Sequence, residues 1–469
     1  MIKKISNSLS LVLLSIAVSI SEGAKPNIVI IFNDDQGYED LGSYGSPTIR
    51  TPHVDQLARE GMRFTDFYVT SSVCSPSRAS LLTGKFPDRV GVPAVFFPNR
   101  PGGLDPEHVT MAEVLRDAGY ATAAIGKWHL GDEPQYLPTN QGFDEYFGIP
   151  YSNDMFPSLS TTYAEDCLFR DGWSEAKILE KFKTIENPGH AWVLRDVVPL
   201  LRDTEAIEFP ADQTTLTRRY ASEGMRFISE SVEAGKPFFL FLAHSMPHVP
   251  LFTEERFIGA SLDGPYGDTI EEIDYHTGRM MDHLKDLGIE DNTVFIFTSD
   301  NGPWLVKGRD AGRALPLFEG KMTYFEGGVR VPFVIRWPAQ IPAGRVIAEP
   351  ATTMDLMPTF AEILGIDLQI DGLDGHSIKG ILTGGPEARS PHEYIFYDRY
   401  AVRQGKWKYH RKEIFKVPPT SRLTDGPSLY DLEADIGETT NLIEDYPDVA
   451  ERLAAKLSEH LEYIGVQLD

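Results

Sequence analysis

Four short apolar runs, each followed by polar residues, constrain what this chain can fold into. The runs are rich in β-branched and aromatic side chains and occupy residues 27–32, 120–125, 237–242 and 293–297. Strands that are apolar on both faces belong in a parallel sheet covered by helices. The pattern therefore predicts an α/β fold with a large, mostly parallel sheet between layers of helices. The polar residues after the strands would share one edge of that sheet, where such folds bind ligands.

The rest of the sequence is arranged around this sheet. Helical patterns occupy residues 51–60, 109–118, 216–232, 269–287 and 355–364. Residues 132–213 break the rhythm, and we expect this insertion to form irregular walls or short elements near the edge. Short alternating strands follow at residues 394–396, 401–404, 407–409 and 428–431, and an amphipathic helix at 449–463 ends the chain. We predict an α/β domain at residues 25–384 and a smaller antiparallel sheet with a helix at residues 385–469.

The N-terminus has the pattern of a secretory signal. Lys3 and Lys4 precede an apolar stretch at residues 9–20, and Gly23-Ala24 supplies small residues for cleavage. A membrane anchor is the alternative, but it needs about twenty apolar residues. We therefore predict that residues 1–24 are a signal peptide, that the mature chain has no stable membrane anchor, and that it is secreted or periplasmic.

The net charge and the cysteine content limit the classes of function that the sequence allows. The formal net charge of −25 has the opposite sign to that of a typical nucleic-acid binder, so we predict no nucleic-acid partner. An anionic substrate would need a local cluster of cations. The chain has two cysteines, Cys74 and Cys167, so an exported protein of this size does not depend on a disulfide framework.

Cys74 lies in a stretch that predicts an anion site. Ser75 suits an N-cap, Pro76 the first helical position and Gly84 the position after the last turn, so residues 76–83 are expected to be helical. Cys74 would then lie at the positive end of a helix, close to Arg78. The alternative interpretation is that Cys74 is a small buried apolar residue beside a capped helix.

Two strand ends carry candidate metal ligands. Asp34 and Asp35 follow the first apolar run, and Asp300 and Asn301 follow the last. Adjacent buried carboxylates repel each other unless a cation neutralises them. A set made only of oxygens favours Ca²⁺ or Mg²⁺ over Zn²⁺. Each pair alone could instead be a solvated turn or a helix cap.

Cations and histidines occupy the other strand ends. Lys127 and His129 follow the second run, His248 follows the third, and Lys321 lies in a glycine-containing loop. Fixed cations, a hard metal and a nucleophile together suit in-line displacement at a tetrahedral oxyanion ester. These residues alone do not choose sulfur over phosphorus.

The sequence resembles the formylglycine-dependent sulfatases of the alkaline-phosphatase superfamily, in their arylsulfatase and carbohydrate-sulfatase branch. The resemblance rests on Cys74-x-Pro76-x-Arg78-x-x-x-Leu82-Thr83-Gly84, on residues 126–131, and on the Asp300-Asn301-Gly302 and Gly320-Lys321 blocks. It implies an alkaline-phosphatase-like mixed sheet and oxidation of Cys74 to Cα-formylglycine by a maturation enzyme. It also implies that the hydrated aldehyde attacks the sulfur of a sulfate ester.

The resemblance implies a role for each site residue. The metal, Ca²⁺ rather than Mg²⁺, would be bound by Asp34, Asp35, Asp300, Asn301 and the modified Cys74. Arg78 and Lys127 would hold the formylglycine and its anion, Lys127 would also bind the substrate, and His129 would act as the base. His248 and Lys321 would grip the sulfate, and one of them would protonate the leaving oxygen. A histidine near its ordinary pKa of about 6.5 is the easier donor, which favours His248.

The substrate is predicted to be a sulfated polysaccharide or its oligosaccharides, including a galactan such as carrageenan. Asn301 stands where some phosphonate and phosphodiester hydrolases of the superfamily carry histidine, which favours the sulfatase branch. Asn153 and Asp154 are the candidates for sugar contacts, and further candidates are Arg170, His190, Arg309, Arg313, Arg399 and Arg403. The alternatives are a phosphonate or phosphodiester hydrolase, and an inactive binder of sulfated glycans in which Cys74 stays a thiol.

Overall fold

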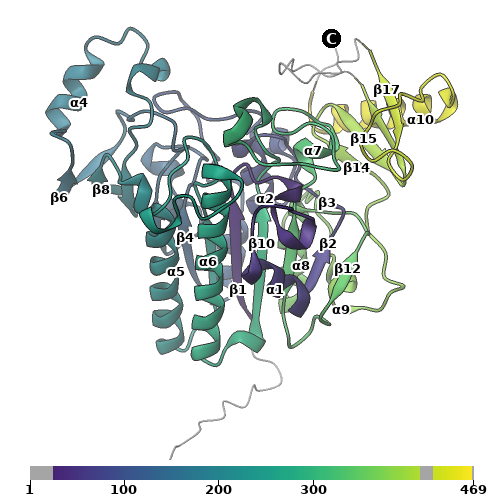
Figure 1. The fold of residues 1–469 in the computed structure, drawn as a ribbon, viewed down its shortest axis with the longest axis horizontal. Helices are drawn as coiled ribbons and strands as arrows, with labels where there is room; N and C mark the ends of the chain where they lie inside the picture. Colours follow the sequence, from purple (N-terminus) through teal and green to yellow (C-terminus); the bar gives the residue numbers. More distant parts are fainter. Residues whose placement is uncertain (1–24, 412–425, 467–469) are drawn as a thin grey trace, which may run out of the picture.

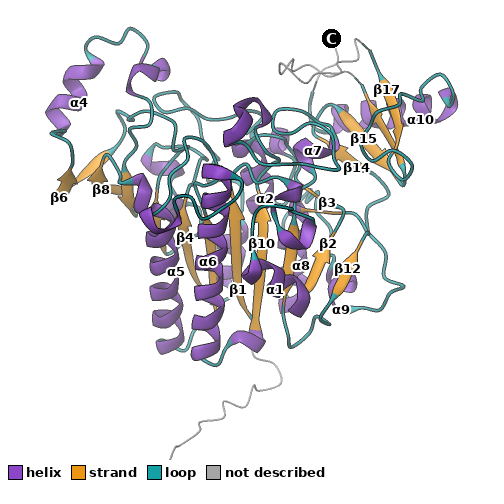
Figure 2. Cartoon of the chain, viewed as in Figure 1, coloured by secondary structure: helices purple, strands orange, loops and turns teal. Residues whose placement is uncertain are grey.

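A central sheet of eleven strands runs through the protein. The computed structural model describes residues 25–411 and 426–466. The strand order in the large sheet is β12-β2-β11-β10-β1-β9-β4-β5-β7-β8-β6. Figure 2 shows these strands between helices that cover both faces. The strands are β1 Asn27–Asn33, β2 Met62–Phe64, β4 Ala121–Gly126, β5 Glu145–Gly148, β6 Thr162–Phe169, β7 Leu200–Arg202, β8 Glu205–Phe209, β9 Phe238–Ala243, β10 Thr293–Ser299, β11 Phe333–Arg336 and β12 Arg345–Ile347.

The four predicted apolar runs form the middle of this sheet. They are the neighbouring strands β10, β1, β9 and β4, and each is parallel to the next. Phe32, near the end of β1, is level with Thr298 of β10 and with Ala243 of β9. The residues that follow these strands therefore meet at one edge, as the sequence predicted. The predicted fold class is confirmed.

Alternate residues of the central strands pack into two separate cores. Ile28, Ile30 and Phe32 of β1 face one core, and Val29 and Ile31 face the other. The first core includes helices α2 (Cys74–Thr83), α3 (Met111–Asp117) and α8 (Leu356–Leu364). The second includes α1 (Pro52–Glu60), α5 (Leu216–Glu233) and α6 (Gly264–Asp286), which lie together on one face in Figure 1. This period-two burial is the physical reason for the two helical layers.

Residues 132–213 form more regular structure than the sequence predicted. Strands β5, β7, β8 and β6 extend the sheet beyond β4, and α4 (Glu175–Phe182) lies with them at one end of the molecule (Figure 1). Most residues of β6 are exposed or half-buried. These strands therefore lack the continuous apolar run that identified the central strands. Helix α6 also begins at Gly264 rather than at residue 269, with Pro265 in its first turn.

A second, smaller sheet forms the C-terminal part of the chain. It is antiparallel and contains β14 (Ile395–Tyr397), β15 (Ala401–Gln404), β16 (Trp407–His410) and β17 (Ser428–Asp431). Helix α10 (Pro447–Tyr463) packs on it through Leu453 and Leu457. The short strands and final helix match the sequence prediction, while the boundary after residue 384 stays a prediction.

The predicted signal peptide, residues 1–24, lies outside the described residues. Within residues 25–411 and 426–466, no helix combines the length and the apolar character needed to cross a membrane.

Candidate active site

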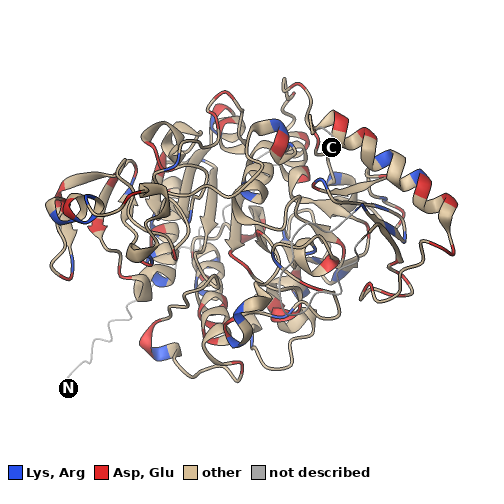
Figure 3. Cartoon of the chain, turned by 90° about the horizontal axis from the view of Figure 1, so that it is seen from above, with Lys and Arg blue, Asp and Glu red and all other residues tan. Residues whose placement is uncertain are grey.

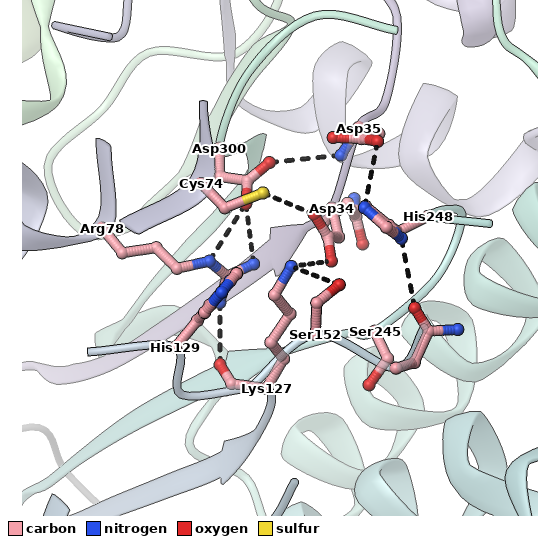
Figure 4. A network of polar contacts seen from close by, with 12 residues as sticks. Asp34, Asp35, Cys74, Arg78, Lys127, His129, Ser152, Ser245, His248 and Asp300 are labelled. Carbon is pink, nitrogen blue, oxygen red and sulfur yellow. Dashed lines mark hydrogen bonds and ion pairs between the residues drawn. The ribbon is translucent and has the colours of Figure 1, made fainter. Parts of the chain in front are cut away.

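The polar residues after the four central strands form one buried cluster. Asp34 and Asp35 follow β1, and Asp300 and Asn301 follow β10. Lys127 and His129 follow β4, His248 lies five residues after β9, and Lys321 comes from the loop before α7 (Glu326–Val329). Figure 4 shows most of these side chains pointing toward one another. The parallel sheet thus brings together residues that are up to 287 positions apart, as Asp34 and Lys321 are.

Cys74 reaches this cluster from the first turn of α2. The helix begins at Cys74, with Val73 as its N-cap, so the predicted start at Pro76 is wrong. Ser75 is not the cap, because its Oγ accepts a hydrogen bond from the Phe96 N–H at 3.2 Å. Pro76 is tolerated because the first N–H groups of a helix have no partner within the helix. Gly84 ends the helix in the left-handed conformation, as predicted, and its N–H donates to the Ser80 carbonyl.

Each carboxylate of the cluster is paired with a buried cation. The three pairs are Lys127 Nζ with Asp34 Oδ2 at 2.5 Å, Arg78 Nη2 with Asp300 Oδ2 at 2.8 Å, and Lys321 Nζ with Asp35 Oδ1 at 2.6 Å. Burial raises the pKa of Asp34, but Lys127 and other nearby cations outweigh it, so its pKa lies below the usual value. Burial and the Asp34 charge raise the pKa of Asp300. The cluster therefore still favours an additional positive charge beside Asp300.

The oxygen atoms of the cluster fit a hard divalent cation. Asp35 Oδ2 and Asn301 Oδ1 are buried and have no hydrogen-bond partner among the described residues. Asn301 Nδ2 donates to Asp35 Oδ1 at 2.7 Å, which holds the two residues together. Cys74 Sγ lies 3.6 Å from Asp34 Oδ1. Buried oxygens without partners beside carboxylates suit Ca²⁺ or Mg²⁺ as ligands.

His129 is held in its neutral form. Its Nε2 donates to the Phe96 carbonyl at 3.0 Å, which leaves the lone pair on Nδ1. Nδ1 is buried and has no hydrogen-bond partner among the described residues. Burial lowers the pKa of His129 well below its usual value, and the charges of Lys127 and Arg78 lower it further. The imidazole is therefore uncharged at neutral pH, and its Nδ1 lone pair is available to accept a proton.

His248 has its ring fixed by contacts on Nδ1. Nδ1 lies 3.1 Å from Asn153 Oδ1 and 2.6 Å from the Val249 carbonyl, so it carries a hydrogen. The opposite nitrogen, Nε2, lies 3.7 Å from Asp35 Oδ2. Asn153 is buried, and its amide nitrogen donates to the Pro250 carbonyl. Asn153 is therefore placed to orient the His248 ring rather than to contact a sugar.

A cleft of about 600 Å³ adjoins the buried cluster. Trp304 connects the two, because its ring lies 5.6 Å from the His248 ring and 4.9 Å from Lys321 Nζ. Sequence reasoning identified Asp154 as part of this region but missed Trp304, although Trp304 follows Asn301 by only three residues. The cleft is lined by Asp154, Trp192, Arg195, Asp196, Val249, Pro250, Leu251, Pro265, Trp304, Lys307 and Asp310.

Five of the six other sequence candidates for sugar contacts are engaged with nearby protein groups. Ion pairs join Arg170 to Asp212, Arg313 to Asp263, Arg399 to Asp88 and Arg403 to Asp66, and His190 contacts Arg100. Arg309 is exposed. Acidic and basic residues alternate along the outer elements of the cartoon in Figure 3. The buried cations of the cluster are therefore a local concentration of positive charge in a chain whose formal net charge is −25.

Comparison with known proteins places the chain in one family. The family profile described as Sulfatase matches residues 26–366, and the profile described as N-sulphoglucosamine sulphohydrolase, C-terminal, matches residues 316–466. The chain is 38% identical to arylsulfatase A of Bos taurus, with 97% of this chain and 90% of the relative covered. It is also 38% identical to N-acetylgalactosamine-6-sulfatase of Canis lupus familiaris, with 82% of this chain and 71% of the relative covered.

Solved structures agree with this placement. The crystal structure of Ps i-CgsB in complex with k-i-k-neocarrahexaose has a TM-score of 0.75 at 29% identity. The match covers 93% of this chain and 92% of the Ps i-CgsB chain. The PsFucS1 sulfatase from Pseudoalteromonas sp. has a TM-score of 0.79 at 28% identity and covers 94% and 90%. The chain belongs to the sulfatase family and is a sulfuric ester hydrolase.

Proposed function

We propose that the protein is an exported carbohydrate sulfatase that carries a formylglycine made from Cys74 by a maturation enzyme. The residues that would hold its Ca²⁺ are Asp34, Asp35, Asp300, Asn301 and the modified residue 74. The observation that carries this proposal is that buried oxygens without hydrogen-bond partners, on Asp35 and Asn301, lie in one cluster with Cys74 and three buried cations.

The state of Cys74 supports its conversion. Burial raises the pKa of the Cys74 thiol to about 12, and Lys127 and Lys321 offset this only in part. The unmodified thiol therefore stays protonated at neutral pH and is a poor nucleophile. Formylglycine would supply a hydrated aldehyde as the nucleophile, and bound Ca²⁺ would supply charge stabilisation at the sulfate oxygens.

The remaining residues bind the sulfate and move protons. Arg78 is fixed by Asp300 and by the Lys127 carbonyl, so its guanidinium cannot swing away from residue 74. Lys127 and Lys321 place two more positive charges beside residue 74, which stabilise the negative charge that develops on the sulfate oxygens. His129 Nδ1 takes a proton from residue 74, and His248 Nε2 donates one to the leaving alcohol oxygen.

The cleft outside the sulfate pocket would bind the alcohol part of the substrate. Trp304 offers a flat aromatic face at the border between the cleft and the sulfate pocket, and Asp154 and Lys307 offer polar partners. The similar Ps i-CgsB was solved with a neocarrahexaose, and a relative at 38% identity is an N-acetylgalactosamine-6-sulfatase. We infer that the substrate is a sulfated polysaccharide or its oligosaccharides, with galactans such as carrageenan as the first to be tested.

Sulfate release from a panel of sulfated glycans tests this proposal. The protein is produced with a formylglycine-generating enzyme and assayed on carrageenan and galactosaminoglycan oligosaccharides and on aryl sulfate, phosphate and phosphonate esters. We expect the highest kcat/KM on a sulfated oligosaccharide. Dominant phosphonate turnover, or binding of glycan without turnover by a chain whose Cys74 peptide has the mass of a thiol, would contradict the proposal.

Two further changes test the nucleophile and the metal. Cys74→Ala is expected to abolish activity, whereas Cys167→Ala, which changes the other cysteine, keeps it. Removal of divalent ions by a chelator is expected to stop turnover, and added Ca²⁺ to restore it. Undiminished turnover after complete chelation, measured with metal analysis of the same sample, would contradict the metal assignment.

A further inference from the structure

We propose that Asp355, His376 and His392 form a second metal site that takes Zn²⁺ and is separate from the active site. Asp355 directly precedes α8, which packs on the large sheet, and His392 lies three residues before β14 of the small sheet. His376 lies in the connection between α8 and β14. A metal bound by all three would join the two sheets.

The ligand atoms of this site are already close together. One nitrogen of each histidine and one carboxylate oxygen of Asp355 all lie within 4.8 Å of one another. His392 Nε2 lies 2.9 Å from Asp355 Oδ1 and 2.8 Å from Oδ2, and the two imidazole rings are 5.1 Å apart. Ligand atoms of tetrahedral zinc are about 3.3 Å apart. Binding therefore requires a short inward movement, which exposed His376 can make.

Neighbouring groups orient His376 and Asp355 for metal binding, while a metal would replace the Nε2 hydrogen that His392 directs at Asp355. His376 Nδ1 donates to the Asp374 carbonyl at 3.0 Å, which leaves the Nε2 lone pair free to coordinate. Asp355 Oδ2 accepts the Thr352 N–H at 2.7 Å, and Oδ1 accepts the His376 N–H at 2.8 Å. Outer contacts of this kind, from a carbonyl to the histidine and from N–H groups to the carboxylate, orient the ligands of known metal sites.

The chemistry of the three ligands indicates which metal this site would bind. Two imidazoles and one carboxylate suit Zn²⁺, whereas the oxygen-rich active site suits Ca²⁺. A cavity of about 290 Å³ lined by His376 and His392 leaves room for water as the fourth ligand. The alternative is an ordinary ion pair between His392 and Asp355, to which His376 would contribute nothing.

Zinc titration of the full-length protein tests the site. The protein is first saturated with Ca²⁺, and Zn²⁺ is then titrated while bound metal and melting temperature are measured. We expect one Zn²⁺ per chain and a melting temperature that rises with Zn²⁺ concentration. His376→Ala and His392→Ala should each weaken binding by at least about 100-fold, since even outer-contact changes cost 10- to 100-fold.

Controls make the outcome decisive. His376 is exposed, so His376→Ala should keep the wild-type circular dichroism and the wild-type melting temperature without zinc. His108→Ala removes another partly exposed histidine and should bind zinc as the wild type does. Wild-type zinc binding that equals that of the His376→Ala/His392→Ala double variant overturns the site. Full zinc binding by the His376→Ala variant also overturns the site, because it would leave only the ion pair between His392 and Asp355. These readouts do not depend on catalytic activity.

Discussion

His248 and Lys321 border the same pocket but are held in different ways. Lys321 Nζ lies 2.6 Å from Asp35 Oδ1 and 3.3 Å from Cys74 Sγ. Burial disfavours its charge, but Asp35 and the other anions around it raise the pKa of Lys321 well above its usual value. Lys321 therefore keeps its proton and acts as a fixed charge. The Nδ1 hydrogen of His248 is used by Asn153 and Val249, so Nε2 is the nitrogen left for the pocket, and we propose His248 as the proton donor.

The dependence on the leaving group separates these two roles. His248→Gln should lower kcat/KM by about 10²- to 10⁴-fold on sugar sulfates, whose alcohols need protonation, and far less on aryl sulfates with acidic phenols. Lys321→Met should lower kcat/KM on sugar sulfates and on aryl sulfates by a similar factor, because it removes a positive charge that stabilises the sulfate oxygens. The measurement is kcat/KM across a series of sulfate esters with different leaving-group pKa. A steeper leaving-group dependence for Lys321→Met than for His248→Gln would reverse the assignment.

Asn153 allows a test of positioning without loss of the imidazole. Asn153→Ala removes the acceptor at 3.1 Å from His248 Nδ1 but leaves the Val249 carbonyl in place. We expect a smaller loss of kcat/KM than for His248→Gln, with the same bias toward poor leaving groups. A loss that is equal on aryl and sugar sulfates would show that Asn153 acts on substrate binding instead.

Helices α1 and α6 are joined by a buried carboxylate. Asp274 of α6 accepts the N–H groups of His53 and Val54 at the start of α1, at 3.1 and 2.8 Å. Burial raises the pKa of Asp274 to about 7 despite these hydrogen bonds. A pKa raised in the folded state means that protonation stabilises the fold. This contribution is fully present below the unfolded pKa of about 3.9 and is lost as the pH rises through about 7.

Asp274→Asn should change how stability depends on pH. The amide stays neutral, so the unfolding free energy of the wild type relative to the variant should fall by about 2 kcal/mol between pH 5 and pH 8. Urea unfolding at several pH values measures this difference. Asp282→Asn, at an exposed position on the same helix, is the control and should show no such trend. A pH-independent difference for Asp274→Asn would contradict the raised pKa.

The elements that the sequence predicted are those with a strong burial signal. The central strands are buried on both faces, so their composition alone located the sheet and the edge where Asp34, Lys127, His248 and Asp300 meet. The strands of residues 132–213 are either short, as β7 is, or largely exposed, as β6 is, and sequence reasoning expected irregular structure there. Trp304 was missed because its value as a site residue comes from a ring contact with His248, which no local pattern encodes.

At the scale of the whole molecule, a buried ionic network joins the two sheets. Glu326 starts α7, five residues after Lys321, and accepts from Lys408 Nζ of β16 at 2.9 Å and from Tyr397 of β14 at 2.8 Å. Lys408 also lies 2.9 Å from Glu438, whose Oε2 accepts the Glu326 N–H. The small sheet thereby supports the loop that carries Lys321.

Lys408→Met tests this support. The change removes the cation between two buried carboxylates and leaves Glu326 with Arg330 at 3.1 Å and Glu438 with His410 at 3.0 Å. It should lower the unfolding free energy by about 3 kcal/mol. It should also lower kcat/KM, because the Lys321 loop loses its support. Denaturant unfolding and steady-state kinetics measure the two effects. Lys456→Met removes a lysine from a partly exposed pair with Glu459 and should stay within about 0.5 kcal/mol of the wild type. A similarly small effect of Lys408→Met would refute the support.

The reacting groups lie at the tips of strands fixed by the middle of the sheet, while much of the cleft beside them is built by segments outside those strands. Residues 159–196 supply Trp192, Arg195 and Asp196 to the cleft and include neither Asn153 nor any residue of the buried cluster. They could therefore be exchanged for the matching segment of another sulfatase without altering the distances between Asp34, Lys127 and Asp300. Such chimaeras offer a practical route to enzymes that remove sulfate from different glycans with one shared reaction centre.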